Sequence, residues 1–165
     1  MFRAYFYILL FSATLFSDIY LIPDETELLL YKLKKDFRDA KQVDIITQEL
    51  SEKKIFRILV KFLNRDSTEL NLILDPNKNS LIYKLSIYQG INIKTLSGIR
   101  EAPMNLNFIL IDNSILYIFS NSFSKIALNQ SYGTVLRFKA RDMIKRFMSI
   151  FTILTKRSSM INNLR

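Results

Sequence analysis

Apolar residues occur along the first half of this chain in two alternating patterns. Short apolar runs bounded by polar or turn-forming residues predict strands, and segments with an apolar residue every three or four positions predict helices. The predicted strands are 18–22, 42–46, 70–74 and 91–94, and the predicted helices between them are 24–40, 51–63 and 80–89. This strand–helix alternation is typical of an α/β domain with a mixed, mostly parallel sheet flanked by helices.

The pattern changes in the second half. Two apolar runs, 106–111 and 115–119, are separated by the turn-forming sequence Asp112-Asn113-Ser114, which predicts a hairpin. A last strand is predicted at 134–138 and a long helix at 140–154. The broad apolar face of this helix comprises Met143, Ile144, Phe147, Met148, Ile150, Phe151 and Leu154. We expect that face to pack on the sheet or on a second subunit.

Residues 1–17 have the features of an export signal. A short positive start, Met1-Phe2-Arg3, precedes thirteen uncharged and mostly apolar residues, 4–16. A helix of that length rises about 20 Å, less than the hydrocarbon core of about 30 Å, which disfavours a permanent membrane span. We therefore expect a signal peptide that is cleaved near Ser17 and a mature periplasmic domain at 18–165. An uncleaved segment would instead anchor the protein in the membrane.

The net charge of +9 is unevenly distributed. Between Asp18 and Leu136, fifteen Lys and Arg residues stand against fourteen Asp and Glu residues, a difference of +1. From Arg137 to Arg165, eight cations stand against one acid, a difference of +7. The candidate binding residues in this basic helix and tail are Arg141, Lys145, Arg146, Lys156 and Arg157. They suit an acidic protein, anionic lipid or nucleic acid, although a solvated helix surface has the same composition.

Two residue types are absent from the chain. Without cysteine, no disulfide or thiolate metal site can form. Without histidine, the sequence lacks the commonest general acid or base, the commonest zinc ligand and every Ser–His or Cys–His nucleophile. Carboxylates, Lys, Arg, Tyr and Ser remain for chemistry, and we expect neither a metal nor a cofactor.

Residues 105–122 carry the most informative pattern. This segment resembles, in its spacing, the signature of the phospholipase D family, H-x-K-x(4)-D-x(6)-G-S-x-N. The predicted order of strands, hairpin and closing basic helix also resembles the small exported single-domain nucleases of that family, over essentially all of the mature chain. The resemblance implies a phospholipase D-like α/β fold. Because single-copy relatives pair to complete one active site, it also implies a homodimer or a larger assembly.

The motif is degenerate at the positions that would react. Asn105 stands at the nucleophilic histidine and Asn107 at the phosphate-binding lysine, while Asp112 and Ser120 are retained. An amide can neither form a phosphohistidine-type intermediate nor shuttle a proton near neutral pH. The missing lysine removes a charge that would stabilise the transition state. Asp112 has a second interpretation, because Asp-Asn-Ser is also an ordinary hairpin turn.

Three further substitutions concern the shape of the cleft. Phe119 replaces the motif glycine, Ser122 replaces the asparagine, and Tyr132 replaces the glutamate that usually follows. Two large rings at these positions predict a cleft that is filled and closed to a phosphate group. We therefore expect no catalytic residue in this chain.

Together these features predict a catalytically inactive phospholipase D-like protein rather than an enzyme. In the periplasm it would act as a structural or partner-binding module, with protein partners in the bacterial envelope, for example in a motility or secretion apparatus. The alternative is non-hydrolytic binding of nucleic acid or anionic phospholipid through the basic C-terminal helix. Residual phosphodiesterase or nuclease activity is a third hypothesis, and we expect it to be absent.

Overall fold

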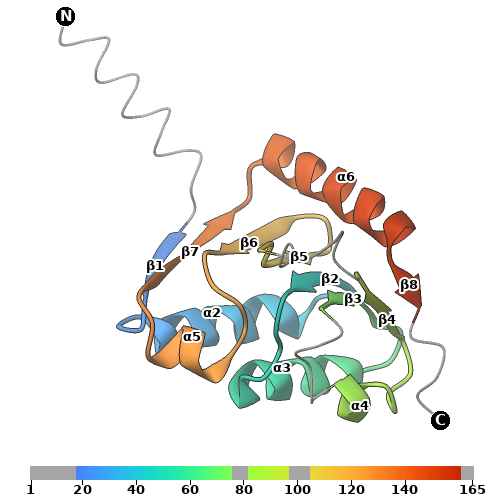
Figure 1. Ribbon diagram of the computed structural model, residues 1–165, viewed down its shortest axis with the longest axis horizontal. Helices are drawn as coiled ribbons and strands as arrows, with labels where there is room; N and C mark the ends of the chain where they lie inside the picture. Colours follow the sequence, from blue (N-terminus) through green and yellow to red (C-terminus); the bar gives the residue numbers. More distant parts are fainter. Residues whose placement is uncertain (1–17, 76–81, 97–104, 161–165) are drawn as a thin grey trace, which may run out of the picture.

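The predicted strands assemble into one mixed sheet. The computed structural model describes residues 18–75, 82–96 and 105–160, and within them eight strands follow the order β1-β7-β6-β5-β2-β3-β4-β8 (Figure 1). The strands are β1 Asp18–Ile22, β2 Gln42–Thr47, β3 Glu69–Leu74, β4 Ile91–Thr95, β5 Phe108–Ile111, β6 Ile115–Phe119, β7 Gly133–Phe138 and β8 Ser159–Met160. The predicted signal segment, 1–17, and the end of the basic tail, 161–165, lie outside the described residues.

Helices cover the two faces of this sheet unequally. One face carries four helices, α2 Thr26–Arg38, α3 Lys53–Leu63, α4 Ile82–Leu85 and α5 Lys125–Asn129. In the described part of the chain, α6 Arg141–Arg157 is the one helix on the opposite face (Figure 1). None of the helices in the described residues is long and apolar enough to cross a membrane.

Parallel pairing is confined to three neighbouring strands. β2 pairs with β3, and β3 with β4, in parallel, whereas the other pairings between named strands are antiparallel. The mixed α/β sheet with flanking helices is confirmed, but its parallel share is smaller than the strand–helix alternation indicated. A three-residue turn joins β5 to β6 and forces an antiparallel pair, and β1 pairs with β7 at the sheet edge instead of with β2.

The core beneath α2 and α3 is the larger of two apolar clusters. The apolar stripe of α2, which includes Leu29, Leu33 and Phe37, is buried against the sheet. Phe37 meets Phe62 of α3 edge to face, with ring centroids 5.7 Å apart. Fully burying an apolar side chain of this size contributes about 1.5–3 kcal/mol, so this cluster accounts for the firm seating of both helices.

The second cluster lies between the sheet and α6. Phe108 of β5 is buried and meets Phe147 of α6 with ring centroids 5.0 Å apart. On the predicted apolar face of α6, Ile144 is buried, and the other six residues are half-buried and pack against this cluster. The expectation that this face packs on the sheet is therefore confirmed, although its burial is shallower than that of α2.

Several element ends differ from the sequence-based prediction. The helix predicted at 24–40 begins at Thr26 and ends at Arg38. Glu25 is its N-cap residue, and the Glu25 carboxylate accepts a hydrogen bond from the Leu21 amide at 2.7 Å. Of the helix predicted at 80–89, the structure describes α4 at Ile82–Leu85, while residues 80 and 81 lie outside the described residues. Gly90 ends this segment with a φ of 74°, and an added Cβ would lie 2.2 Å from the Thr68 carbonyl oxygen.

Candidate functional site

A polar cavity of about 320 Å³ lies at one edge of the sheet. It forms where β2 ends, β5 begins and β6 ends, and α5 supplies one wall. The residues that line it are Gln48, Asn105, Asn107, Ser120, Asn121, Ser122, Ser124, Ile126, Ala127 and Ser131. This is the carboxyl edge of the parallel strands, where α/β sheets commonly bind ligands. Four motif positions, Asn105, Asn107, Ser120 and Ser122, meet here.

The Asn107 side chain has a structural role, because its hydrogen bonds connect separate strands. Its side chain is buried, and its Oδ1 accepts hydrogen bonds from the Thr47 hydroxyl at 2.9 Å and from the Gln48 amide at 3.1 Å. The Asn107 carbonyl oxygen also accepts from the Phe119 amide at 2.9 Å. One residue thus joins the end of β2, the start of β5 and the end of β6, which defines the floor of the cavity.

Asn105 and Ser120 contribute in different ways. Asn105 is exposed and lies at the cavity without a structural bond of the kind that Asn107 makes. Ser120 Oγ accepts from the Thr134 amide at 2.9 Å. Gly133 makes this close approach of the chain possible, because a Cβ there would lie 2.4 Å from Asn121 Nδ2 and 2.8 Å from Ser120 Oγ.

Asp112 lies away from the cavity, at the opposite end of β5. It and Asn113 have φ angles of 48° and 51°, as the tight turn between β5 and β6 requires. Its Oδ1 accepts from the Lys41 and Gln42 amides, both at 2.8 Å, and so holds the hairpin against the start of β2. The hairpin-turn interpretation of Asp112 is therefore the one that the structure supports.

The prediction of a filled cleft is wrong. Phe119 turns into the core on the α2 and α3 side, where it is 4% exposed and its ring centroid lies 4.5 Å from that of Phe123. Alternation along β6 explains this, because Ile115, Tyr117 and Phe119 share the face that packs on that core. Tyr132 is 92% exposed and turns to solvent. Neither ring occupies the cavity, which stays open.

The cavity lining determines what chemistry is available there. The described residues that line it contribute amides, hydroxyls and two apolar side chains, and none of these described residues carries a charged side chain. Such groups can hydrogen-bond a neutral polar ligand, but a serine hydroxyl with no adjacent base is a weak nucleophile. The arrangement also lacks a cation to stabilise the charge of a phosphoryl transition state.

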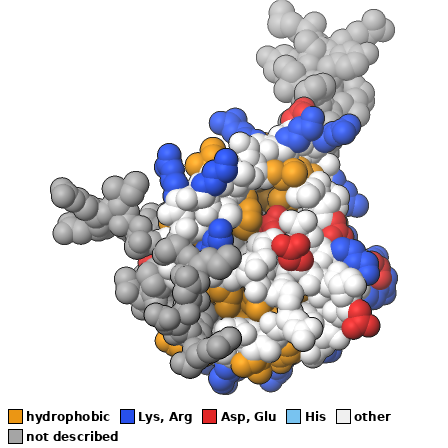
Figure 2. Space-filling model, turned by 90° about the vertical axis from the view of Figure 1, so that its right-hand side faces the viewer, with side chains coloured by type: hydrophobic (Ala, Val, Ile, Leu, Met, Phe, Trp, Pro, Cys, Tyr) orange, Lys and Arg blue, Asp and Glu red, His pale blue; other side chains and the backbone are white. Residues whose placement is uncertain are grey.

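The five predicted binding cations are exposed on α6 and are not part of the cavity. Arg141, Lys145 and Arg146 lie in its first half, while Lys156 and Arg157 lie in its last turn, where the helix dipole favours cations. Figure 2 shows Lys and Arg side chains along the upper edge of one face, the edge on which α6 lies in Figure 1. Any ligand of these cations would therefore bind apart from the motif positions.

A buried ionic network joins α2 to three strands of the sheet, and it was not predicted from the sequence. Asp36 of α2 accepts from the Tyr117 hydroxyl at 2.5 Å and from Arg137 Nε at 2.8 Å, and Arg137 Nη1 reaches Asp18 at 3.1 Å. Burial, followed by the Asp36 carboxylate, raises the pKa of Tyr117, and burial with Asp18 raises the pKa of Tyr20 to about 12. Both phenols stay protonated at physiological pH, so the network fastens β1, α2, β6 and β7 together rather than supplying a base.

Wall residues such as Gln48, Asn121 and Ser124 were likewise not singled out from the sequence. Ser124 caps α5, because its Oγ accepts from the Ala127 amide at 3.1 Å. A five-residue helix inside a polar stretch gives little periodic signal, so the wall that it builds was not predicted. For Gln48, its place directly after a parallel strand was a usable signal.

Solved structures of other proteins resemble this one, whereas sequence comparisons find no match. No family model matches the sequence, and no curated protein matches it. Among solved structures, NucT from Helicobacter pylori is 20% identical with a TM-score of 0.78, covering 87% of this chain and 98% of its own. Nuc from Salmonella typhimurium, a phospholipase D family member, is 15% identical with a TM-score of 0.71, covering 88% and 97%.

A third similar structure is the archaeal chromatin protein TrmBL2, described as showing a novel mode of DNA binding. It is 12% identical with a TM-score of 0.59, covering 87% of this chain and 54% of its own. The chain therefore has a phospholipase D-like fold, as the sequence predicted.

Proposed function

We propose that this protein is a catalytically inactive phospholipase D-like protein that acts in the periplasm by binding a partner. The observation that carries the proposal is the uncharged lining of the cavity at the motif positions. Where phosphodiester chemistry would need a nucleophile and a cation, the chain has Asn105 and Asn107, and the Asn107 amide is already bonded to Thr47 and Gln48. The fold is kept while the reacting groups are absent.

The size of the expected loss supports the same conclusion. Removing the nucleophile of a comparable catalytic unit lowers the rate by about 10⁶-fold. Losing a preorganised group that stabilises the charge of the transition state lowers the rate by a further factor of about 10²–10³ in typical cases. Although the cavity is open, openness restores neither contribution, so the absence of chemistry follows from the lining and not from blockage.

The partner-binding half of the proposal rests on the surface. The exposed cations of α6 suit an acidic protein in the envelope, such as a component of a motility or secretion apparatus. A homodimer belongs to the same proposal, because the resemblance to single-copy family members implies pairing. Neutralising the α6 cations tests the interaction with an acidic partner, and sedimentation of the purified protein tests the homodimer.

Nucleic acid or anionic phospholipid is the second candidate ligand. Five exposed cations on one helix favour it, and TrmBL2 offers an example of this fold in a protein described as binding DNA. Phosphate binding through these cations would weaken steeply as salt concentration rises. A shallow salt dependence of DNA affinity would exclude this candidate.

A titration with phosphodiester tests the cavity directly. Adding dimethyl phosphate to isotopically labelled protein should leave the amide signals of Asn105 and Ser120 without saturable change at millimolar concentrations. Inorganic phosphate serves as a second probe, since it carries more charge. Saturable shifts confined to cavity residues would show that the site still holds phosphate and would contradict the proposal.

A further inference from the structure

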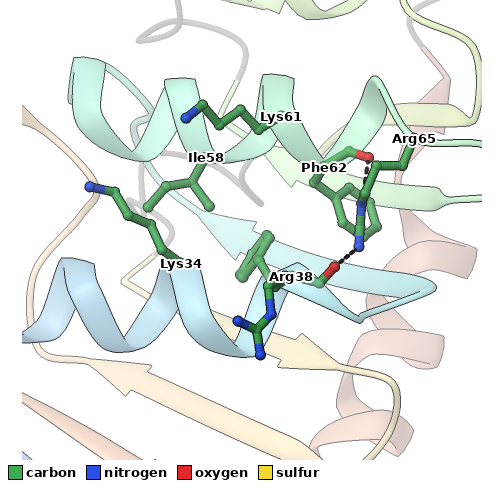
Figure 3. Close-up of a pocket in the computed structure, with 7 residues that line it drawn as sticks. Lys34, Arg38, Ile58, Lys61, Phe62 and Arg65 are labelled. Atoms are coloured by element: carbon green, nitrogen blue, oxygen red, sulfur yellow. Dashed lines mark hydrogen bonds between the residues drawn. The ribbon is translucent and has the colours of Figure 1, made fainter.

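A second concave surface lies between α2 and α3 (Figure 3). Both helices lie on the face of the sheet opposite α6 (Figure 1). This groove has a volume of about 290 Å³. Lys34 and Arg38 of α2 and Ile58, Lys61 and Arg65 of α3 line it. Figure 3 shows Lys34 extending toward the α3 side, whereas the Arg38 guanidinium turns away from α3. Phe37 and Phe62 form its floor, and the methylene stems of the lysines and arginines extend the apolar lining outward.

One end of the groove is bridged. Arg65 crosses to the end of α2, where Nη1 donates to the Arg38 carbonyl oxygen and Nη2 donates to that of Ala40 at 2.7 Å. Glu27 of α2 also forms an ion pair with Lys54 of α3, at the N-terminal ends of the two helices and beyond the residues that line the groove. The groove is therefore a short depression that Arg65 closes at one end.

The charge of the groove is almost entirely positive. The Arg65 guanidinium donates its hydrogen bonds to backbone carbonyl oxygens, which carry no net charge. It lies 5.0 Å from the centroid of the Phe62 ring. Four cations among the described residues line the groove. Of these, Arg38 forms an ion pair with Asp39 at 3.5 Å, and both of these side chains are exposed. Such a pair is worth about 0–1 kcal/mol, so it neutralises little of the local field.

We propose that this groove binds an acidic segment of a protein partner, with one apolar side chain in the depression. The apolar side chain would lie between the Lys34 and Lys61 stems, and flanking carboxylates would pair with Lys34, Lys61 and Arg38. Charge complementarity selects an anionic segment. The small volume fits a side-chain anchor better than a lipid surface, which would need a broad exposed apolar face.

This inference goes beyond the proposed function, because it concerns a different face of the molecule. The groove residues pack on the α2 and α3 core, whereas the α6 cations border the other cluster. Groove binding and cavity chemistry can therefore fail or succeed independently. The +1 balance of residues 18–136 did not reveal this site, because the sequence does not show that the charged residues lining one groove are Lys34, Arg38, Lys61 and Arg65.

The test uses a fluorescent peptide with a phenylalanine between two pairs of glutamates, and the purified protein. Anisotropy should show saturable binding, and the Lys34→Gln/Lys61→Gln variant should weaken it at least about tenfold. The matched control is Lys125→Gln/Lys139→Gln, which removes the same charge from exposed positions outside the groove and should stay within about twofold. Replacing the peptide phenylalanine with alanine should also weaken binding.

Three results would overturn the inference. Equal weakening in both lysine variants would mean that only net charge attracts the peptide. Unchanged affinity in the groove variant would place the binding site elsewhere. Groove-dependent binding to phosphatidylglycerol vesicles without peptide binding would identify a membrane ligand instead. Because the lysines concerned are exposed, thermal unfolding of every variant should match that of the unmodified protein.

Discussion

Asn105 and Asn107 stand two positions apart in one motif but differ in what they contribute. Asn107 is buried and bonds two groups of the β2 end, whereas Asn105 is exposed at the cavity mouth. The sequence pattern showed that asparagine stands at both positions where the phospholipase D signature has its histidine and lysine. It could not show that one of the two now stabilises the fold, because that depends on the distant residues Thr47 and Gln48.

Asparagine-to-alanine changes at these two positions should have unequal effects on stability. Asn107→Ala removes the buried oxygen to which the Thr47 hydroxyl and the Gln48 amide donate, so we expect a loss of about 1–3 kcal/mol in the free energy of unfolding. The matched change Asn105→Ala should stay within about 0.5 kcal/mol. Urea unfolding measures both. Equal, small effects would contradict the structural role of Asn107.

A second residue-scale prediction concerns Asp44 of β2. Its side chain is buried, and burial raises the pKa of Asp44, more than the hydrogen bonds from Asn71 and Gln42 lower it. The contribution of Asp44 to stability is therefore greatest when it is protonated, below its ordinary pKa of 3.8, and is lost as pH rises through the higher folded value. Asp44→Asn should raise the melting temperature at pH 7.

The advantage of Asp44→Asn should disappear in acid. Below pH 3.8 both side chains are neutral, so the two melting curves should converge. Asp66→Asn at an exposed position is the control, and it should leave the pH profile unchanged. A lower melting temperature for Asp44→Asn at pH 7 would mean that the charge is stabilising in the fold.

At the scale of elements, the sequence predicted strongly periodic segments well. The apolar runs predicted β1 to β7, and helical spacing predicted α2, α3 and α6, with ends displaced by a few residues. It missed α5 and β8, because five polar-flanked residues and a two-residue strand carry no periodic signal. It also overestimated parallel pairing, since nothing local to β1 shows that its partner is β7, over a hundred residues away.

Helix α6 separates a packing role from a charge role. Ile144 is 4% exposed, so Ile144→Ala should lower the free energy of unfolding by about 2–5 kcal/mol. Phe151→Ala should cost less than the 3–5 kcal/mol of a fully buried ring, because Phe151 is half-buried. Lys145→Ala should stay within about 0.5 kcal/mol. Thermal or urea unfolding ranks the three, and a large effect of Lys145 would contradict the assignment.

The cations of α6 are tested together. Changing Lys145, Arg146, Lys156 and Arg157 to glutamine should abolish association with envelope proteins, membranes or DNA, and leave the melting curve in place. Co-sedimentation and native cross-linking measure that association. If it survives, these cations are only solvated surface and the partner binds elsewhere, with the α2–α3 groove as the next surface to test.

At the scale of the whole molecule, the sequence located the site but misjudged its state. Motif spacing identified four cavity residues, Asn105, Asn107, Ser120 and Ser122. The cleft was expected to be filled because Phe119 and Tyr132 are large, yet size does not fix direction. The pleat turns Phe119 into the core, and Tyr132 lies in solvent. Which way a ring turns depends on the tertiary packing of β6, which spacing alone cannot give.

Export is the molecule-scale prediction from the N-terminus. If residues 1–17 are a cleaved signal, N-terminal sequencing of the periplasmic protein should begin near Asp18. The intracellular precursor provides the uncleaved reference for the same measurement. An intact Met1 on the membrane-bound protein would show an anchor instead of a cleaved signal.

Turnover of a phosphodiester tests the central claim most directly. Purified protein should hydrolyse neither an oligonucleotide nor phosphatidylcholine above a mock preparation, because none of the described residues that line the cavity carries a charged side chain. Asn105→Ala and Ser120→Ala are the appropriate variants, since Asp112 bonds the Lys41 and Gln42 amides and its loss would disturb the fold. Indistinguishable, blank-level rates for all three proteins are the predicted result. Turnover by the unmodified protein that a folded Asn105→Ala or Ser120→Ala variant loses would contradict the account.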